Sequence, residues 1–130
     1  MKITRFEDFP IWKESIKVVK EVYKLTSNKY FSKDFGLRDQ LRRASVSINS
    51  NIVEGFEKNN NNEFIRYLKI AKGSSGEVRS QMYISREIDY VTEEEFVKIS
   101  NLLDNLSRQI GGFINYLTNK RINKEFITKN

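Results

Sequence analysis

The chain contains no cysteine and no histidine among its 130 residues. The absence of cysteine excludes disulfides and thiolate chemistry, and the absence of histidine removes the commonest general base. Zinc centres of the usual kinds also depend on these two residue types. An enzyme built from this chain would have to rely on carboxylates, lysine, arginine, serine or tyrosine. We therefore expect a non-enzymatic protein that has no metal and no cofactor.

Long apolar runs are absent as well. No stretch approaches the roughly 20 apolar residues of a membrane-spanning helix, and the charged start is not followed by the apolar core of a secretory signal. We expect a cytoplasmic protein with no membrane partner. Lysine and arginine (23) outnumber aspartate and glutamate (17), which gives a net charge of +6 and a pI of about 9.5. This balance favours a polyanionic partner such as RNA or DNA.

Proline occurs once, at Pro10, where the first turn of a helix accepts it. Elsewhere apolar residues recur every three or four positions, a spacing typical of amphipathic helices. Four helices are predicted, over residues 9–27, 36–58, 63–88 and 93–119. Their short connections predict one all-α domain over residues 1–119, an antiparallel up-down-up-down four-helix bundle. A basic polar tail is expected over residues 120–130.

The apolar spacing also predicts which faces are buried. The first helix is expected to turn Phe9, Trp12, Ile16, Val19, Tyr23 and Thr26 toward the core. Other apolar side chains are expected either to cover a second subunit or to pack within the monomer. They are Val18, Val22, Leu25, Tyr67, Ile70 and Tyr116.

Gly73 and Gly76 interrupt the third predicted helix, where each costs up to about 1 kcal/mol relative to alanine. This segment lacks the lysine and hydroxyl residue that complete a phosphate-binding P-loop. We expect the two glycines to let another helix approach closely.

A group of polar residues interrupts the apolar pattern of the second predicted helix. Arg43, Ser47, Asn51 and Glu54 follow helical spacings of one face, and Glu77 of the third helix is placed to meet them. We predict a structural polar network that fixes the register of the two helices. The alternative is that Glu54 and Glu77 form an acid–base or metal-binding pair, but di-metal bundles add Glu-x-x-His motifs that this chain lacks.

Basic residues form a second pattern. Lysine and arginine can neutralise phosphates, and a nearby tyrosine can stack on a base. The predicted nucleic-acid contacts are Arg38, Arg42, Lys69, Lys72, Arg79 and Arg86, with Tyr83 among them and Lys120, Arg121 and Lys124 as an extension. The alternative is an ordinary solvated helix face.

Three segments match the ordered motifs of a known family. They are Phe6–Phe9 with Ile11–Lys13; Leu37, Gln40–Ala44, Ser47–Ile48, Ser50–Ile52 and Glu54–Phe56; and Phe64, Tyr67–Leu68, Ile70–Ala71, Gly73–Ser74 and Glu77. Over residues 6–117 the chain resembles the four-helix-bundle proteins of 23S ribosomal RNA intervening sequences, also labelled S23 ribosomal proteins. Asn49 departs from the family pattern, which often has proline at this place.

The resemblance implies a left-handed antiparallel bundle that assembles as a homopentamer. It also implies a gene that lies within, or is related to, inserted segments of ribosomal RNA genes. A related branch of the family binds nucleic acid and a reverse transcriptase. Our leading hypothesis is therefore a self-assembling, non-enzymatic bundle that binds RNA or DNA. The alternative is a protein–protein interaction scaffold with no direct role in nucleic-acid binding.

Overall fold

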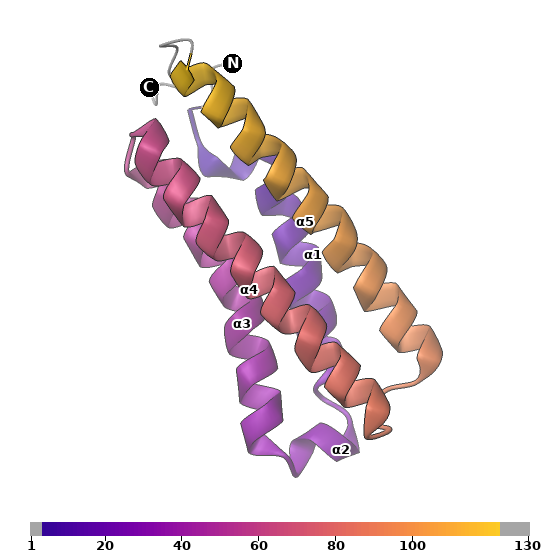
Figure 1. Cartoon of the computed structure of the whole chain (residues 1–130). Helices are drawn as coiled ribbons and strands as arrows, with labels where there is room; N and C mark the ends of the chain where they lie inside the picture. The colour runs from indigo at the N-terminus through magenta and orange to yellow at the C-terminus, as the bar shows by residue number, and fades with distance from the viewer. Residues whose placement is uncertain (1–3, 123–130) are drawn as a thin grey trace.

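The computed structural model describes residues 4–122, and the side chains of residues 4–120. Its elements are η1 (Phe6–Asp8), α1 (Pro10–Leu25), α2 (Lys29–Ser32), α3 (Phe35–Glu57), α4 (Asn61–Glu87) and α5 (Glu93–Ile122). All regular elements in this part of the chain are helices (Figure 1), which confirms the all-α prediction. A short helix, α2, lies in a stretch predicted to be irregular, and α5 continues beyond the predicted end at residue 119. The rest of the predicted tail, 123–130, lies outside the described residues.

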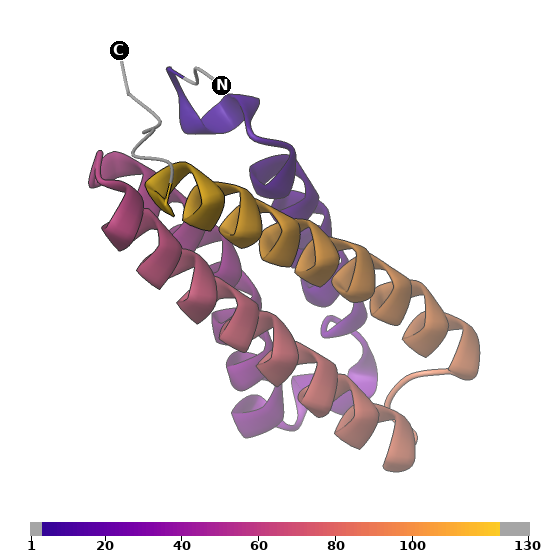
Figure 2. The same ribbon diagram turned by 45° about the horizontal axis from the view of Figure 1, so that its top comes forward.

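The four long helices form a closed ring. Helix α3 packs against α1 and α4, and α5 packs against the same two helices, so α1 and α4 are diagonal to each other. Figures 1 and 2 show the four long helices side by side, around a shared interior. A bundle of helices is thus confirmed, whereas the strict up-down-up-down order and the left-handed sense stay predictions.

Polar side chains begin the helices. Asn28, Asp34 and Asn60 each accept hydrogen bonds from backbone N–H groups in the first turn of the helix that follows. Before α5, the Glu95 N–H donates to Thr92 Oγ1 at 3.1 Å and the Thr92 N–H donates to Glu95 Oε1 at 2.8 Å. This reciprocal pair is a capping box, which satisfies two backbone N–H groups at the start of α5.

The buried faces of α4 and α5 follow the predicted spacing. On α4 they include Phe64, Leu68, Ala71, Ser75, Val78, Met82 and Ser85, and on α5 Phe96, Ile99, Leu103, Leu106, Ile110 and Leu117. Near one end, the ring of Phe9 makes edge-to-face contacts with the rings of Phe56, Phe64 and Phe113 at centroid distances of 5.1–5.6 Å. This cluster joins the start of α1 to the other three long helices.

The buried face of α1 is rotated from the predicted one. The apolar spacing predicts that Ile16 and Tyr23 face the core, but they are 36% and 41% exposed. The true face includes Ser15, whose Oγ donates to the Trp12 carbonyl at 2.6 Å and accepts from Asn49 Nδ2 at 2.9 Å. Because its hydroxyl is hydrogen-bonded, this serine can be fully buried. It interrupts the apolar stripe, so the sequence alone does not show which face of α1 is buried.

The rotation changes which side chains remain for a partner. Val18, Val22 and Leu25 lie in the core, at 0%, 0% and 3% exposure, so of the two alternatives these three side chains pack within the monomer and do not cover a second subunit. Ile70 is 41% exposed and stays available on the surface of α4.

The glycines of α4 also differ from the prediction. A Cβ atom added at Gly73 or Gly76 would meet nothing within 4 Å, so neither residue serves close helix packing among the described residues. Close approach occurs instead at Gly55 of α3, where an added Cβ would lie 2.7 Å from Tyr67 Cβ and 3.0 Å from Phe64 Cδ1. Gly55 therefore sets the distance between α3 and α4 at this end of the bundle.

At the opposite end, the α1–α3 and α4–α5 connections are joined. Asn28 Nδ2 donates to the Tyr90 carbonyl at 2.9 Å, and the Tyr90 hydroxyl donates to Asp34 Oδ2 at 2.9 Å. The Tyr90 ring also packs edge-to-face on Phe31 and stacks on Tyr30. The bond to the Asp34 carboxylate is the main reason why the pKa of the Tyr90 phenol is raised.

Candidate nucleic-acid interface

Four of the predicted phosphate contacts lie along α4. Lys69 and Lys72 are exposed and make no hydrogen bond or ion pair within residues 4–120. Lys72, Arg79 and Arg86 follow a seven-residue spacing, so they share one side of α4, and their contacts with Gly111, Asp104 and Glu93 show that this side is next to α5. We call Lys69, Lys72, Arg79 and Arg86 the α4 basic row.

Carboxylates partly neutralise the positive charge of Arg79 and Arg86, the C-terminal half of the α4 basic row. Arg79 Nε lies 3.5 Å from Asp104 Oδ1 of α5. The guanidinium of Arg86 lies 3.2 Å from Glu87 and 3.8 Å from Glu93, and it stacks over Phe96 at 4.3 Å from the ring centroid. Exposed pairs of this kind contribute only about 0–1 kcal/mol, so a polyanion can replace them.

Tyr83 lies beside the α4 basic row, as predicted, and is 48% exposed. Part of the Tyr83 ring is already covered. The ring contacts Phe96 at a centroid distance of 4.9 Å and lies 5.2 Å from the Arg86 guanidinium. Stacking of a base on Tyr83 stays a prediction. In the predicted extension, Lys120 lies over the Tyr116 ring, whereas the Arg121 side chain and Lys124 lie outside the described residues.

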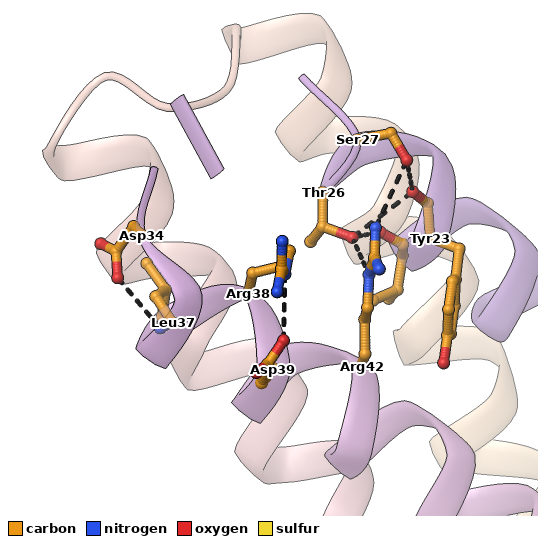
Figure 3. Close-up of polar contacts among 9 residues, drawn as sticks. Tyr23, Thr26, Ser27, Asp34, Leu37, Arg38, Asp39 and Arg42 are labelled. Atoms are coloured by element: carbon orange, nitrogen blue, oxygen red, sulfur yellow. Dashed lines mark hydrogen bonds and ion pairs between the residues drawn. The ribbon is translucent and has the colours of Figure 1, made fainter. Parts of the chain in front are cut away.

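Arg38 and Arg42 come from α3, and Figure 3 shows Arg42 beside Thr26 and Tyr23 at the end of α1. Arg42 Nε donates to Thr26 Oγ1 at 2.9 Å, and its guanidinium lies 4.6 Å from the Tyr23 ring centroid, so it joins α3 to the end of α1. Arg38 donates to Asp39 Oδ1 at 3.0 Å. Because the α1/α3 edge is opposite the α4/α5 edge, the structure does not bring these two arginines together with the α4 basic row.

The predicted polar network is divided into separate contacts. Asn51 Nδ2 donates to the carbonyl of Ser47 at 2.8 Å and to its Oγ at 3.0 Å, and the Ser47 and Ser74 hydroxyls share a hydrogen bond of 3.0 Å. Tyr67 reaches Glu54 only at 3.5 Å, so this bond is weak. The Ser47–Ser74 hydrogen bond therefore joins α3 to α4, through a serine that does not belong to the predicted network.

The charged members of the predicted network are exposed. Within residues 4–120, no hydrogen bond or ion pair links Arg43, Glu54 and Glu77 to one another. Glu77 instead accepts a hydrogen bond from Gln81 Nε2 at 3.3 Å, and Gln81 also contacts Gln40. Arg43 and Glu77 line an open hollow of about 380 Å³ between α3 and α4. Their role in fixing helix register stays a prediction.

A second hollow, of about 470 Å³, lies beside the α4 basic row. It is lined by Arg79, Asn101, Asp104, Ser107 and Arg108. Sequence reasoning missed the four α5 residues because their spacing reads as the solvated face of an amphipathic helix. The available signal was Arg108, four positions after Asp104 on the same face of α5.

The described residues contain no group of three or more acidic side chains that could hold a metal ion. Among the helices of residues 4–122, none has both the length and the apolar character needed to cross a bilayer.

Comparison with known proteins agrees with this architecture. The crystal structure of a protein of unknown function from the S23 ribosomal protein family of Bacteroides thetaiotaomicron superposes with a TM-score of 0.73. The two sequences are 23% identical, and the match covers 80% of this chain and 97% of that chain, so it shows a shared fold. No curated protein matches the sequence. Residues 7–112 match the family described as 23S rRNA-intervening sequence protein, and the chain belongs to that family.

Proposed function

We propose that this protein is a non-enzymatic helical bundle that binds nucleic acid, RNA or DNA, along its α4/α5 edge. The observation that carries this proposal is the α4 basic row, in which Lys69 and Lys72 are exposed and have no partner among the described residues. Each lysine can replace a counterion on a phosphate, and the release of counterions favours binding. The paired arginines beside them can exchange weak surface ion pairs for stronger bonds to phosphate.

Self-assembly would strengthen such binding. In a homopentamer, the α4 basic row would be repeated five times on one particle, and simultaneous contacts would raise a weak affinity. Membership of the family is consistent with a gene in, or related to, intervening sequences of 23S ribosomal RNA.

The test replaces Lys69 and Lys72 together by glutamate. Neither side chain takes part in an intramolecular ion pair among the described residues, so the far-UV circular dichroism should not change. Binding of a labelled single-stranded RNA should weaken. The slope of log affinity against log salt should become shallower by about 0.7 for each phosphate that the variant no longer neutralises.

Lys20 and Lys24 provide the matched control. They are exposed on α1, diagonal to α4, and their replacement by glutamate changes the net charge by the same amount. If the two double variants bind RNA equally, the proposed edge is wrong. If the wild-type protein binds neither RNA nor DNA at low salt, the proposed function is wrong.

A second candidate function is a protein-interaction scaffold, and an apolar hollow favours it. This hollow of about 320 Å³ lies between the start of α1 and the second half of α5. Its lining consists of Phe9, Pro10, Ile11, Gln109, Gly112, Phe113 and Tyr116. A Cβ at Gly112 meets nothing within 4 Å, so Gly112→Glu should fold while placing a charge at this surface. Light scattering should then show a smaller assembly if copies associate here, and an unchanged mass would exclude this contact.

A further inference from the structure

The hollow between α4 and α5 combines several hydrogen-bond donors at one place. Arg79 comes from α4, and Arg108, Asn101 and Ser107 come from α5. Two guanidinium groups, an amide and a hydroxyl are groups that bind phosphate oxygens in nucleic-acid complexes. Asp104 is the acidic member of the lining.

The two arginines have most of their donors available. Arg79 Nε lies 3.5 Å from Asp104 Oδ1, with 46% and 54% of the two side chains exposed. Arg108 Nε donates to the backbone carbonyl of Asp104 at 3.4 Å, a long hydrogen bond. A guanidinium carries five N–H donors in a planar fork, so each arginine uses only a small part of its capacity here. Both forks can turn toward an anion that enters the hollow.

We propose that this hollow binds a backbone phosphodiester of the nucleic acid, and that Asp104 is the internal anion that the phosphate displaces from Arg79. This inference rests on the proposed function and identifies a subsite within the same edge. Phosphate, like a carboxylate, carries a full charge and accepts two parallel hydrogen bonds from arginine, so it can replace Asp104, whose half-exposed carboxylate lies 3.5 Å from Arg79 Nε.

The position of the hollow favours a polymer over a single anion. Lys72 precedes Arg79 by two helical turns, about 10 Å along the same side of α4. Lys72 Nζ lies only 3.6 Å from the place of a Cβ on Gly111, so it too projects over the surface of α5. The row of cations therefore continues from the hollow along the side of α4 that faces α5. Successive phosphates of one strand can occupy such a row, whereas one free phosphate can fill only one place.

Replacing Asp104 and replacing Arg108 should change the affinity for RNA in opposite directions. Asp104→Asn removes the competing charge, so RNA affinity at low salt should rise about fivefold, the effect of one unit charge at roughly 4 Å in water. Arg108→Gln should lower it by about the same factor and make the salt slope shallower by about 0.7. The probe is a labelled single-stranded RNA of mixed sequence, titrated at two salt concentrations with the full chain.

The Glu63–Arg66 pair supplies matched controls on the same helix as Arg79. Arg66 Nε donates to Glu63 Oε2 at 2.7 Å, and this hydrogen bond lowers the pKa of Glu63. Glu63→Gln and Arg66→Gln change the net charge as Asp104→Asn and Arg108→Gln do, but away from the hollow. Circular dichroism of all four variants checks that they are folded.

The outcomes separate the subsite from the wider proposal. Stronger binding by Asp104→Asn and weaker binding by Arg108→Gln, beyond the effect of the control variants, would support it. Equal effects at Glu63 and Asp104, or weaker binding by Asp104→Asn, would overturn it. If RNA binding depends on Lys69 and Lys72 but not on Asp104 or Arg108, only this inference fails. If no RNA binds, it fails together with the proposed function.

Discussion

Replacing Gly55 by alanine tests how closely α3 and α4 approach. The new methyl group would lie 2.7 Å from Tyr67 Cβ, 3.0 Å from Phe64 Cδ1 and 3.4 Å from the Phe64 carbonyl oxygen. Tyr67 Cβ is fixed to the backbone of α4 and cannot rotate away, so the helices must separate. Such overpacking costs about 1–3 kcal/mol, and the better helix propensity of alanine offsets up to about 1 kcal/mol. We expect the free energy of unfolding to fall by about 1–2 kcal/mol.

Gly73→Ala and Gly76→Ala are the matched substitutions on α4. Neither new methyl group would meet any atom within 4 Å, so only the helix propensity changes. Each variant should be more stable than the wild type by about 0.5–1 kcal/mol. The same chemical change therefore has opposite effects at positions that the sequence does not distinguish.

These differences in the free energy of unfolding are measured by urea and thermal unfolding. Both are followed by far-UV circular dichroism at equal protein concentrations. For a domain of this size, 1 kcal/mol corresponds to a shift of roughly 3–5 °C in the midpoint. Gly55→Ala with wild-type stability would refute the packing argument. A loss of stability in Gly73→Ala that depends on protein concentration would show that another copy of the chain packs against this glycine.

Three further predictions concern single side chains. Arg42→Ala should lower the free energy of unfolding by about 1 kcal/mol in a urea titration, because it removes the bond to Thr26, and an unchanged midpoint would contradict this. Ser75→Ala should raise thermal stability, since the buried Ser75 hydroxyl has no partner among the described residues, and a lower midpoint would count against it. The bond to Asp34 raises the pKa of Tyr90, so its contribution to stability is fully present below about pH 10 and is lost as the pH rises through the folded value. Tyr90→Phe should flatten that alkaline loss of stability, and an unaltered pH profile would refute the assignment.

The sequence predicts this fold well wherever apolar residues alone form the buried face. On α5, Phe96, Ile99, Leu103, Leu106 and Ile110 are all buried, as their spacing predicts. On α1, by contrast, the spacing selects the wrong face. Apolar periodicity shows which face of a helix is buried only when that face contains few polar groups. A hydrogen-bonded serine on the buried face of α1 violates that condition.

The candidate site could be predicted only in part. The basic residues of α4 share a face because the helix fixes their spacing. The separation of Arg42 from Arg79 depends on which helices are neighbours around the ring, and no local pattern encodes this order. Asp104 and Arg108 join the site for the same reason, through the contact between α4 and α5. Exposed glycine and packed glycine also look alike in a sequence, because the difference lies in the neighbouring helix.

The bonds among Asn28, Tyr90 and Asp34 have a consequence for how the chain can change in length. Two connections that hold each other must keep matching dimensions, so an insertion or deletion in one would misplace the other. The link between α3 and α4 at residues 58–60 lies at the far end and is exposed. Natural variants and engineered fusions should therefore gain extra residues at this asparagine-rich turn and keep the joined end constant.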